Sequence, residues 1–240
     1  MPTFLENGII NYMVKRILID LDDTIFDFKA CEKQALSSAL TEFGLIYNEN
    51  DLNEYSRIND LMWKALEKGE ITREDLRVRR FEIFLERFVE PIDARSFSDL
   101  YMDHLSKTNV LINGARKLLS YLSERYDLYA VTNGYEYTQR GRIESANIGG
   151  YFRQIFISQC IGAVKPMKEF FDYCAHSIPD FSLRDTVLIG DSPTSDISGA
   201  KAYGILSIRY NPAHLPNPSS AIPDREVESL SEIPSLLESL

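Results

Sequence analysis

Three aspartates stand within four positions at the end of a short apolar segment, in the stretch RILIDLDDT. They are Asp20, Asp22 and Asp23, and the next residue is Thr24. Carboxylates this close repel one another and raise each other's pKa unless a cation lies between them. The stretch is therefore either a solvated turn or a site that holds a metal ion and carries out chemistry.

Polar residues also follow three later apolar segments, DLYAV, QIFIS and TVLIG. These residues are Thr132, Asn133, Lys165, Asp191, Ser192 and Asp196. Each has an ordinary explanation when taken alone: Asn before Gly is typical of a turn, and an acidic residue favours the first turn of a helix. Their joint occurrence, each after a successive apolar segment, favours one shared site.

The elements that must position these residues are short strands alternating with amphipathic helices from about residue 110 onward. Such alternation predicts βαβ units and a parallel sheet with helices on both faces. Because ligands bind beyond the carboxyl ends of parallel strands, we expect the polar residues to meet at one edge of the sheet. The fold class is α/β, with a Rossmann-like parallel core flanked by helices.

Between the first strand and residue 109 the pattern is helical, and a capping box is expected where Thr72 precedes Asp75 by three residues. We therefore predict a helical cap subdomain over residues 28–108, inserted into an α/β core of residues 13–27 and 109–240. Residues 1–12 are interpreted as an N-terminal extension, since they have neither the basic start nor the apolar core of a secretory signal.

Composition excludes several classes of protein. The formal net charge of -10 argues against a nucleic-acid polymer as partner, and no apolar run is long enough to span a membrane. Cys31, Cys160 and Cys174 show no metal-binding spacing, which favours reduced thiols in a cytoplasmic protein. A small phosphorylated metabolite is compatible with the charge, because it needs only a metal ion and a local cation.

The segments DLDDT, VTNG, VKP and GDSPTSD, in this order and spacing, resemble the four motifs of the haloacid dehalogenase (HAD) superfamily. The resemblance covers the chain from Val14 onward and implies a type C1 helical cap. It implies that Asp20 is the nucleophile, forming an aspartyl phosphate, and that Asp22 is the general acid and base. Mg²⁺ is implied as cofactor, held by the side chains of Asp20 and Asp191 and the main-chain carbonyl of Asp22.

The resemblance also assigns the remaining residues. Thr132, through its hydroxyl, and Asn133, through its main-chain amide, are expected to bind the phosphoryl group, whose charge Lys165 neutralises. Asp196 is expected to orient Lys165 or a metal-bound water, and Ser192 to order its loop. Asp23 is expected to point away from the phosphate and Thr24 to tie down the turn.

The cap and the late segment RYNPAHLP resemble the YjjG-like pyrimidine 5′-nucleotidase branch, which implies a nucleoside 5′-monophosphate as substrate. Trp63, Arg79 and Arg80 are candidates to approach a base, although Trp63 is better explained as part of the cap core. A carboxylate at Asp22 disfavours a dehalogenase, which needs no leaving-group acid. A sugar-phosphate phosphatase or a phosphomutase remains an alternative, as does a phospho-regulatory domain, and a monomer or homodimer is expected.

Overall fold

The computed structural model describes residues 13–89 and 91–240, so the predicted extension over residues 1–12 lies outside the described residues. The chain forms two compact units. The core unit comprises residues 13–25, 112–133 and 148–240, and the helical unit comprises residues 26–111 and 134–147 apart from residue 90. Each unit is described by itself.

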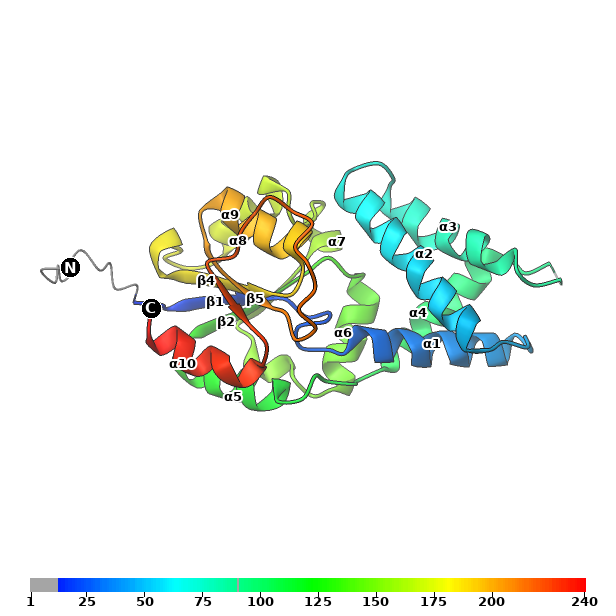
Figure 1. The fold of residues 1–240 in the computed structure, drawn as a ribbon, viewed down its shortest axis with the longest axis horizontal. Helices are drawn as coiled ribbons and strands as arrows, with labels where there is room; N and C mark the ends of the chain where they lie inside the picture. The colour runs from blue at the N-terminus through cyan, green and yellow to red at the C-terminus, as the bar shows by residue number, and fades with distance from the viewer. Residues whose placement is uncertain (1–12, 90) are drawn as a thin grey trace, which may run out of the picture. The chain divides into compact units, whose positions relative to one another are not determined.

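The core unit is built on a parallel sheet of six strands in the order β3-β2-β1-β4-β5-β6 (Figure 1). The strands are β1 (Arg16–Ile19), β2 (Asp127–Thr132), β3 (Gln154–Ile157), β4 (Thr186–Gly190), β5 (Leu206–Tyr210) and β6 (Arg225–Val227). All four residues of β1 are buried, as expected for a central strand covered on both faces. The expected α/β fold with a Rossmann-like core is confirmed.

Helices cover both faces of this sheet. They are α5 (Ala115–Arg125), α7 (Ser158–Ile161), α8 (Lys168–Ser177), α9 (Ser198–Tyr203) and α10 (Ile233–Glu238). Figure 1 shows α8 and α9 on one side of the strands and α5 and α10 on the other. Under α8, Phe170 and Phe171 pack with Leu18, Val131 and Leu188 of the central strands in one buried cluster. This packing fixes the ends of β1, β2 and β4 relative to one another.

The strand order reverses between β1 and β4, which lie side by side in the sheet with β2 and β5 on their outer sides. The register pairs Ile19 of β1 with Ala130 of β2 and with Ile189 of β4. The residues that follow these three strands therefore emerge at the same edge. A reversal of this kind is where open α/β sheets place their ligands.

The helical unit contains α1 (Phe28–Glu42), α2 (Glu49–Glu67), α3 (Arg73–Leu85), α4 (Ala94–Lys107) and α6 (Glu136–Ser145). Its interior is aromatic: Tyr55 stacks on Phe81 at 5.2 Å between ring centroids, and Tyr101 lies 5.1 Å from the same ring. The predicted capping box of α3 is present, since the Thr72 hydroxyl accepts from the Asp75 amide and the Asp75 carboxylate accepts from the Thr72 amide.

The sequence pattern predicts the segment of α6 as part of the α/β core, whereas the structure groups residues 134–147 with the helical unit. Gly141 explains the packing, because a Cβ there would lie 2.6 Å from the main-chain oxygen of Ser106 in α4. Without a side chain at this position the two helices approach closely. The unit boundaries also differ, falling after Ile25 and before Ile112 rather than at residues 27 and 109.

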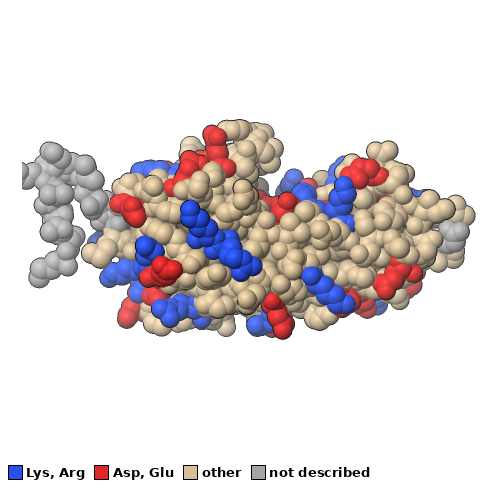
Figure 2. All heavy atoms as spheres, turned by 90° about the horizontal axis from the view of Figure 1, so that it is seen from below, with Lys and Arg blue, Asp and Glu red and all other residues tan. Residues whose placement is uncertain are grey.

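Among the described residues no helix combines the length and the apolar character needed to cross a membrane. On the face of the described residues shown in Figure 2, Lys and Arg side chains are interspersed with Asp and Glu.

Candidate active site

The first acidic turn begins at Asp20, directly after β1. Its main-chain amide still pairs with the carbonyl of Ile189 at 2.9 Å, so the residue is held as an extension of the strand, and only 6% of it is exposed. The chain then reverses through Asp23, which has a positive φ of 57°, and the Ile25 amide closes the turn on the Leu21 carbonyl at 2.8 Å. Asp20 is thus fixed by the sheet, and Asp22 and Asp23 by the turn.

A buried ammonium group lies against Asp20. Lys165 is 1% exposed, and its Nζ donates to Asp20 Oδ1 at 2.6 Å, to Asp196 Oδ1 at 2.7 Å and to the Val131 carbonyl at 3.0 Å. Burial would lower the pKa of Lys165, but the charges of Asp196 and Asp20 outweigh burial and raise it. The charged form of Lys165 is therefore favoured. Asp196 lies beside Lys165, one of the two neighbours that the resemblance allows for it.

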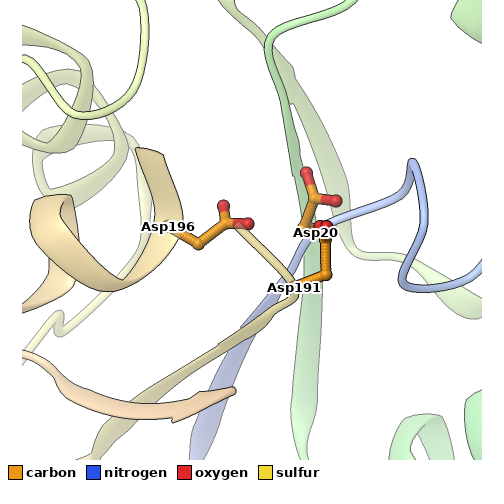
Figure 3. Close-up of side chains that lie close together, drawn as sticks. All are labelled: Asp20, Asp191 and Asp196. Carbon is orange, nitrogen blue, oxygen red and sulfur yellow. The ribbon is translucent and has the colours of Figure 1, made fainter. Parts of the chain in front are cut away.

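Three carboxylates converge beyond the strand ends. Asp20, Asp191 and Asp196 offer oxygen atoms that all lie within 4.8 Å of one another, and Figure 3 shows their carboxyl groups close together. Withdrawal from water, together with the charges of Asp196 and Asp22, raises the pKa of Asp20 to about 8 against the opposing charge of Lys165. Burial, and then the charges of Asp20 and Asp196, likewise raise the pKa of Asp191 well above its usual range.

This crowding fits a divalent cation. Lys165 pairs with two of the three carboxylates, Asp20 and Asp196. The carboxylates of Asp20, Asp191 and Asp196 together offer the hard oxygen ligands that Mg²⁺ prefers. Asp196 is 1% exposed and is committed to Lys165 and to the Ser192 amide, which donates to its Oδ2 at 3.2 Å. Asp20 and Asp191 lie together at this edge, where the motif resemblance expects the ion to be held, and that assignment stays a prediction.

Thr24 also contributes to this edge. It is fully buried, and its hydroxyl lies 3.5 Å from Asp191 Oδ1. The sequence analysis expected Thr24 to tie down its own turn, and the structure adds that it links the first turn to the residue after β4. Thr24 therefore helps to keep the two acidic loops in register.

The loop after β2 is joined to the Lys165 loop through a side chain. The Asn133 amide nitrogen donates to the Lys165 carbonyl at 2.9 Å, and the Asn133 amide oxygen accepts from the Lys165 main-chain N–H at 2.8 Å. The motif resemblance assigns only the main-chain amide of Asn133, to the phosphoryl oxygens. The signal that was missed is chemical: a carboxamide has the same donor and acceptor pair as a peptide group.

Asp196 itself depends on two neighbours. Ser192 Oγ accepts from the Ser195 amide at 3.2 Å and so caps the helical turn over Pro193–Ile197 that carries Asp196. Gly190 is the second, because a Cβ there would overlap the carboxyl group of Asp196. The loop-ordering role expected of Ser192 agrees with this geometry, whereas the need for glycine before Asp191 was not anticipated.

Comparison with known proteins decides the family. The family model for haloacid dehalogenase-like hydrolases matches residues 17–210, which include every site residue described above. The chain belongs to this family. The resemblance drawn from the motifs is confirmed, and this hydrolase is an enzyme, as predicted.

Several curated relatives of this hydrolase cover nearly its whole length. It is 36% identical to the HAD-hydrolase YfnB of Bacillus subtilis over 223 residues, which are 93% of this chain and 95% of YfnB. It is 37% identical to the pyrimidine 5′-nucleotidase PynA of Streptococcus pneumoniae over 220 residues, 91% of this chain and 93% of PynA. The pyrimidine 5′-nucleotidase YjjG of Escherichia coli is 28% identical over 222 residues, 92% of this chain and 96% of YjjG.

Among solved structures, the hydrolase resembles Bacillus subtilis YfnB bound to magnesium, with a TM-score of 0.89 and 36% identity over 93% of this chain and 98% of that one. The 2-haloacid dehalogenase of Pseudomonas syringae has a TM-score of 0.66 at 24% identity, and covers 94% of this chain and 99% of that one. That likeness shows a shared fold and nothing further.

The candidate base contacts of the hydrolase occupy different places within the helical unit. Arg80 is 2% exposed; it donates to Asn59 Oδ1 at 2.7 Å and lies 4.8 Å from the Phe81 ring centroid, so it belongs to the interior. Trp63 is only partly buried and packs edge-on against Tyr135 at 5.9 Å. Arg79 is exposed. The structure therefore makes Arg80 a structural residue.

Proposed function

We propose that this hydrolase is a Mg²⁺-dependent phosphomonoesterase that acts through an aspartyl phosphate on a nucleoside 5′-monophosphate, most closely a pyrimidine nucleotide. The observation that carries the chemistry is the contact of the Lys165 ammonium with Asp20 at 2.6 Å, next to Asp191. A carboxylate held beside a fixed cation is oriented for attack, and the same cation compensates the charge of a bound phosphoryl group. The substrate class is supported by the similarity to PynA and YjjG over more than nine-tenths of this chain.

In the first step, a carboxylate oxygen of Asp20 forms a bond to phosphorus while the bond from phosphorus to the ester oxygen breaks. Asp22, in the turn that follows, gives its proton to the departing ester oxygen. Lys165 holds the attacking carboxylate, and Thr132 and the main-chain amide of Asn133 bind the phosphoryl oxygens. When bound, Mg²⁺ would supply charge neutralisation between Asp20, Asp191 and the phosphoryl group.

In the second step, the Asp22 carboxylate takes a proton from a water molecule, whose oxygen bonds to phosphorus as the bond to Asp20 breaks. Inorganic phosphate leaves and the Asp20 carboxylate is restored. Asp22 thus ends the cycle protonated, ready for the next ester. The presence of a carboxylate at this position supports an oxygen leaving group that needs a proton.

A panel of phosphate esters with Mg²⁺ tests this proposal on three proteins: the wild type, Asp20→Asn and Asp180→Asn. Asp180 is an exposed aspartate with a positive φ of 52°, a conformation that asparagine tolerates, so its variant controls for the substitution itself. We expect phosphate release from the wild type and from Asp180→Asn, fastest with a pyrimidine nucleoside 5′-monophosphate, and a loss of more than about a thousandfold in Asp20→Asn. Full activity of Asp20→Asn, or of the wild type in EDTA, would refute the mechanism.

The role of Asp22 is tested with p-nitrophenyl phosphate, whose leaving group needs no protonation. In Asp22→Asn the first step should survive while hydrolysis of the aspartyl phosphate slows, so a rapid-mixing experiment should show a burst of one equivalent of p-nitrophenol per enzyme. A slow release without a burst would show that Asp22 acts elsewhere in the cycle.

A sugar phosphate is the second candidate substrate. The human N-acylneuraminate-9-phosphatase is 24% identical to this chain over 238 residues, 95% of each chain, a lower similarity than that of the nucleotidases. If sugar phosphates outrank every nucleotide in the same panel, the substrate assignment is wrong and the mechanism stands.

A further inference from the structure

A buried arginine lies next to the acidic loop after β4. Arg209, in β5, is 4% exposed and pairs in register with Gly190, the residue directly before Asp191. The neighbouring residue Ile208 is a fully buried apolar residue, as expected in a covered parallel strand. Burying a guanidinium group costs free energy unless its N–H groups are hydrogen-bonded, so the partners of Arg209 indicate its role.

The partners of Arg209 lie on two different elements. Its Nε donates to the main-chain carbonyl of Asp191 at 3.3 Å, and its Nη1 donates to Glu226 Oε2 on β6 at 3.2 Å. Glu226 has 42% of its side chain exposed, so the carboxylate reaches in from the surface to meet a buried cation. The guanidinium group is thus held at one end by Glu226 on the edge strand β6 and at the other by the main-chain carbonyl of Asp191.

The same carboxylate joins the segment RYNPAHLP to this arrangement. The Asn211 amide nitrogen donates to Glu226 Oε1 at 3.1 Å and to the Leu215 carbonyl at 3.1 Å, while its amide oxygen accepts from the Leu215 N–H at 2.9 Å. The segment is therefore folded back on itself and attached to β6. The catalytic scheme above assigns no role to these residues.

We infer that Arg209 is a positioning residue that holds the peptide group of Asp191 so that the Asp191 carboxylate is presented to a divalent cation. This inference rests on the metal site of the proposed function. A hydrogen bond to the Asp191 carbonyl restricts rotation of the peptide that follows the carboxylate-bearing carbon, and so restricts where the carboxylate points. Partners that orient metal ligands in this way usually contribute a factor of about 10 to 100 in metal affinity.

The competing explanation is that Arg209 serves only to attach β6 to β5 through Glu226. The two explanations can be distinguished by experiment, because the contact with Glu226 can be removed while the contact with Asp191 is kept. Glu226→Ala removes the attachment to β6 and leaves the contact with Asp191, whereas Arg209→Met removes both contacts while keeping an unbranched side chain in place of the arginine stem. Arg209→Lys keeps one charged donor that can reach a single acceptor.

The experiment is calorimetric titration of the full-length chain with Mg²⁺, in the absence of any substrate, for the wild type and these three variants. We expect Arg209→Met to weaken Mg²⁺ binding about tenfold or more, Glu226→Ala to change it less than about twofold, and Arg209→Lys to lie between. Thermal unfolding provides the second measurement. Mg²⁺ should raise the Tm of Glu226→Ala as much as that of the wild type, but should raise the Tm of Arg209→Met less.

Equal Mg²⁺ affinity in the wild type and Arg209→Met would overturn the inference while leaving the metal site intact. Equal weakening in Arg209→Met and Glu226→Ala would also overturn it, because the attachment of β6 would then account for the whole effect. No Mg²⁺ binding by the wild type would overturn the proposed metal site, and this inference with it. The failure of the inference is thus distinguishable from the failure of the proposed function.

Discussion

The side chain of Asn133 pairs with the main chain of Lys165 in both directions, donating to its carbonyl at 2.9 Å and accepting from its N–H at 2.8 Å. These residues stand 32 positions apart in the sequence. Asn133 directly follows β2, and Lys165 lies in the loop between α7 and α8. Neighbouring strands form the same pair of hydrogen bonds between two peptide groups, but here the carboxamide of Asn133 takes the place of one peptide group. This pairing fixes the main chain from which the Lys165 ammonium reaches Asp20.

Asn133→Asp should disrupt this pairing selectively. The new carboxylate has no donor for the Lys165 carbonyl and faces it with a negative oxygen. We therefore expect the free energy of unfolding to fall by about 1–3 kcal/mol and kcat to fall as well. Urea unfolding and phosphate release under saturating Mg²⁺ measure the two effects. Asn109→Asp is the matched control, since Asn109 also donates to a main-chain carbonyl, that of Ser145 at 3.2 Å, but is exposed to water. Similar losses in both variants would contradict a special role for Asn133.

Lys165→Met should leave the Asp20 and Asp196 carboxylates buried without their shared cation. Removing one partner of a buried ion pair costs about 3–5 kcal/mol, so a clear drop in Tm is expected, together with a fall in kcat of at least about a hundredfold. Lys168→Met is the control in the same unit, because Lys168 is exposed, pairs with Asp172 one turn away on α8 and lies 5.6 Å from the Tyr203 ring centroid. Its effect on unfolding should stay below about 0.5 kcal/mol. Retention of kcat in Lys165→Met would show that Lys165 is not needed at the phosphoryl group.

The sequence predicts the position of the acidic residues well, because the geometry of a parallel sheet leaves little choice. Once β1, β2 and β4 are recognised as buried parallel strands, Asp20, Thr132 and Asp191 must emerge at one edge. The motif resemblance leaves Asp196 beside either Lys165 or a metal-bound water, and the structure shows the contact with Lys165. These relationships depend on local patterns and on a general property of the fold.

Other relationships could not be read from the sequence, because they depend on which side chains meet after packing. The amphipathic pattern of α6 predicts a helix but does not say which helix it covers. Its place on α4 is seen in the structure, where Gly141 approaches Ser106 and the Tyr137 hydroxyl donates to Asp103. In the sequence, Arg209 is only one polar residue within a predicted buried strand. Its partners, the Asp191 carbonyl and Glu226, are set by the strand order, which the sequence pattern leaves undetermined.

The ion pair between Asp51 and Arg87 in the helical unit predicts a pH-dependent stability. The Asp51 Oδ1 accepts from Arg87 Nη2 at 2.8 Å, and this hydrogen bond lowers the pKa of Asp51 in the folded state. The stabilisation is therefore complete above the unfolded pKa of about 3.9 and is lost as the pH falls toward the folded value, because the unfolded chain then binds the proton first.

We expect Asp51→Asn and Arg87→Met to be less stable than the wild type by about 1 kcal/mol at pH 6, and the difference to shrink as the pH falls below about 3.9. Urea titrations followed by the fluorescence of Trp63 measure this unit directly, since Trp63 is the single tryptophan of the chain and lies in α2. A difference that stays constant over this range would mean that the charge of Asp51 does not contribute.

Gly190→Ala tests whether the Asp196 side chain needs the space that glycine leaves. The added Cβ would overlap the Asp196 carboxyl group, which must then move away from the Lys165 ammonium that it contacts at 2.7 Å. We expect a loss of stability of about 1–3 kcal/mol and a fall in kcat, because overpacking of a rigid interior and loss of this contact act together. Gly150→Ala is the matched control in the same unit, since a Cβ there meets nothing within 4 Å. If both alanine variants keep wild-type Tm and kcat, the Asp196 carboxylate can adjust its position without cost, and its contact with Lys165 does not set the geometry of the site.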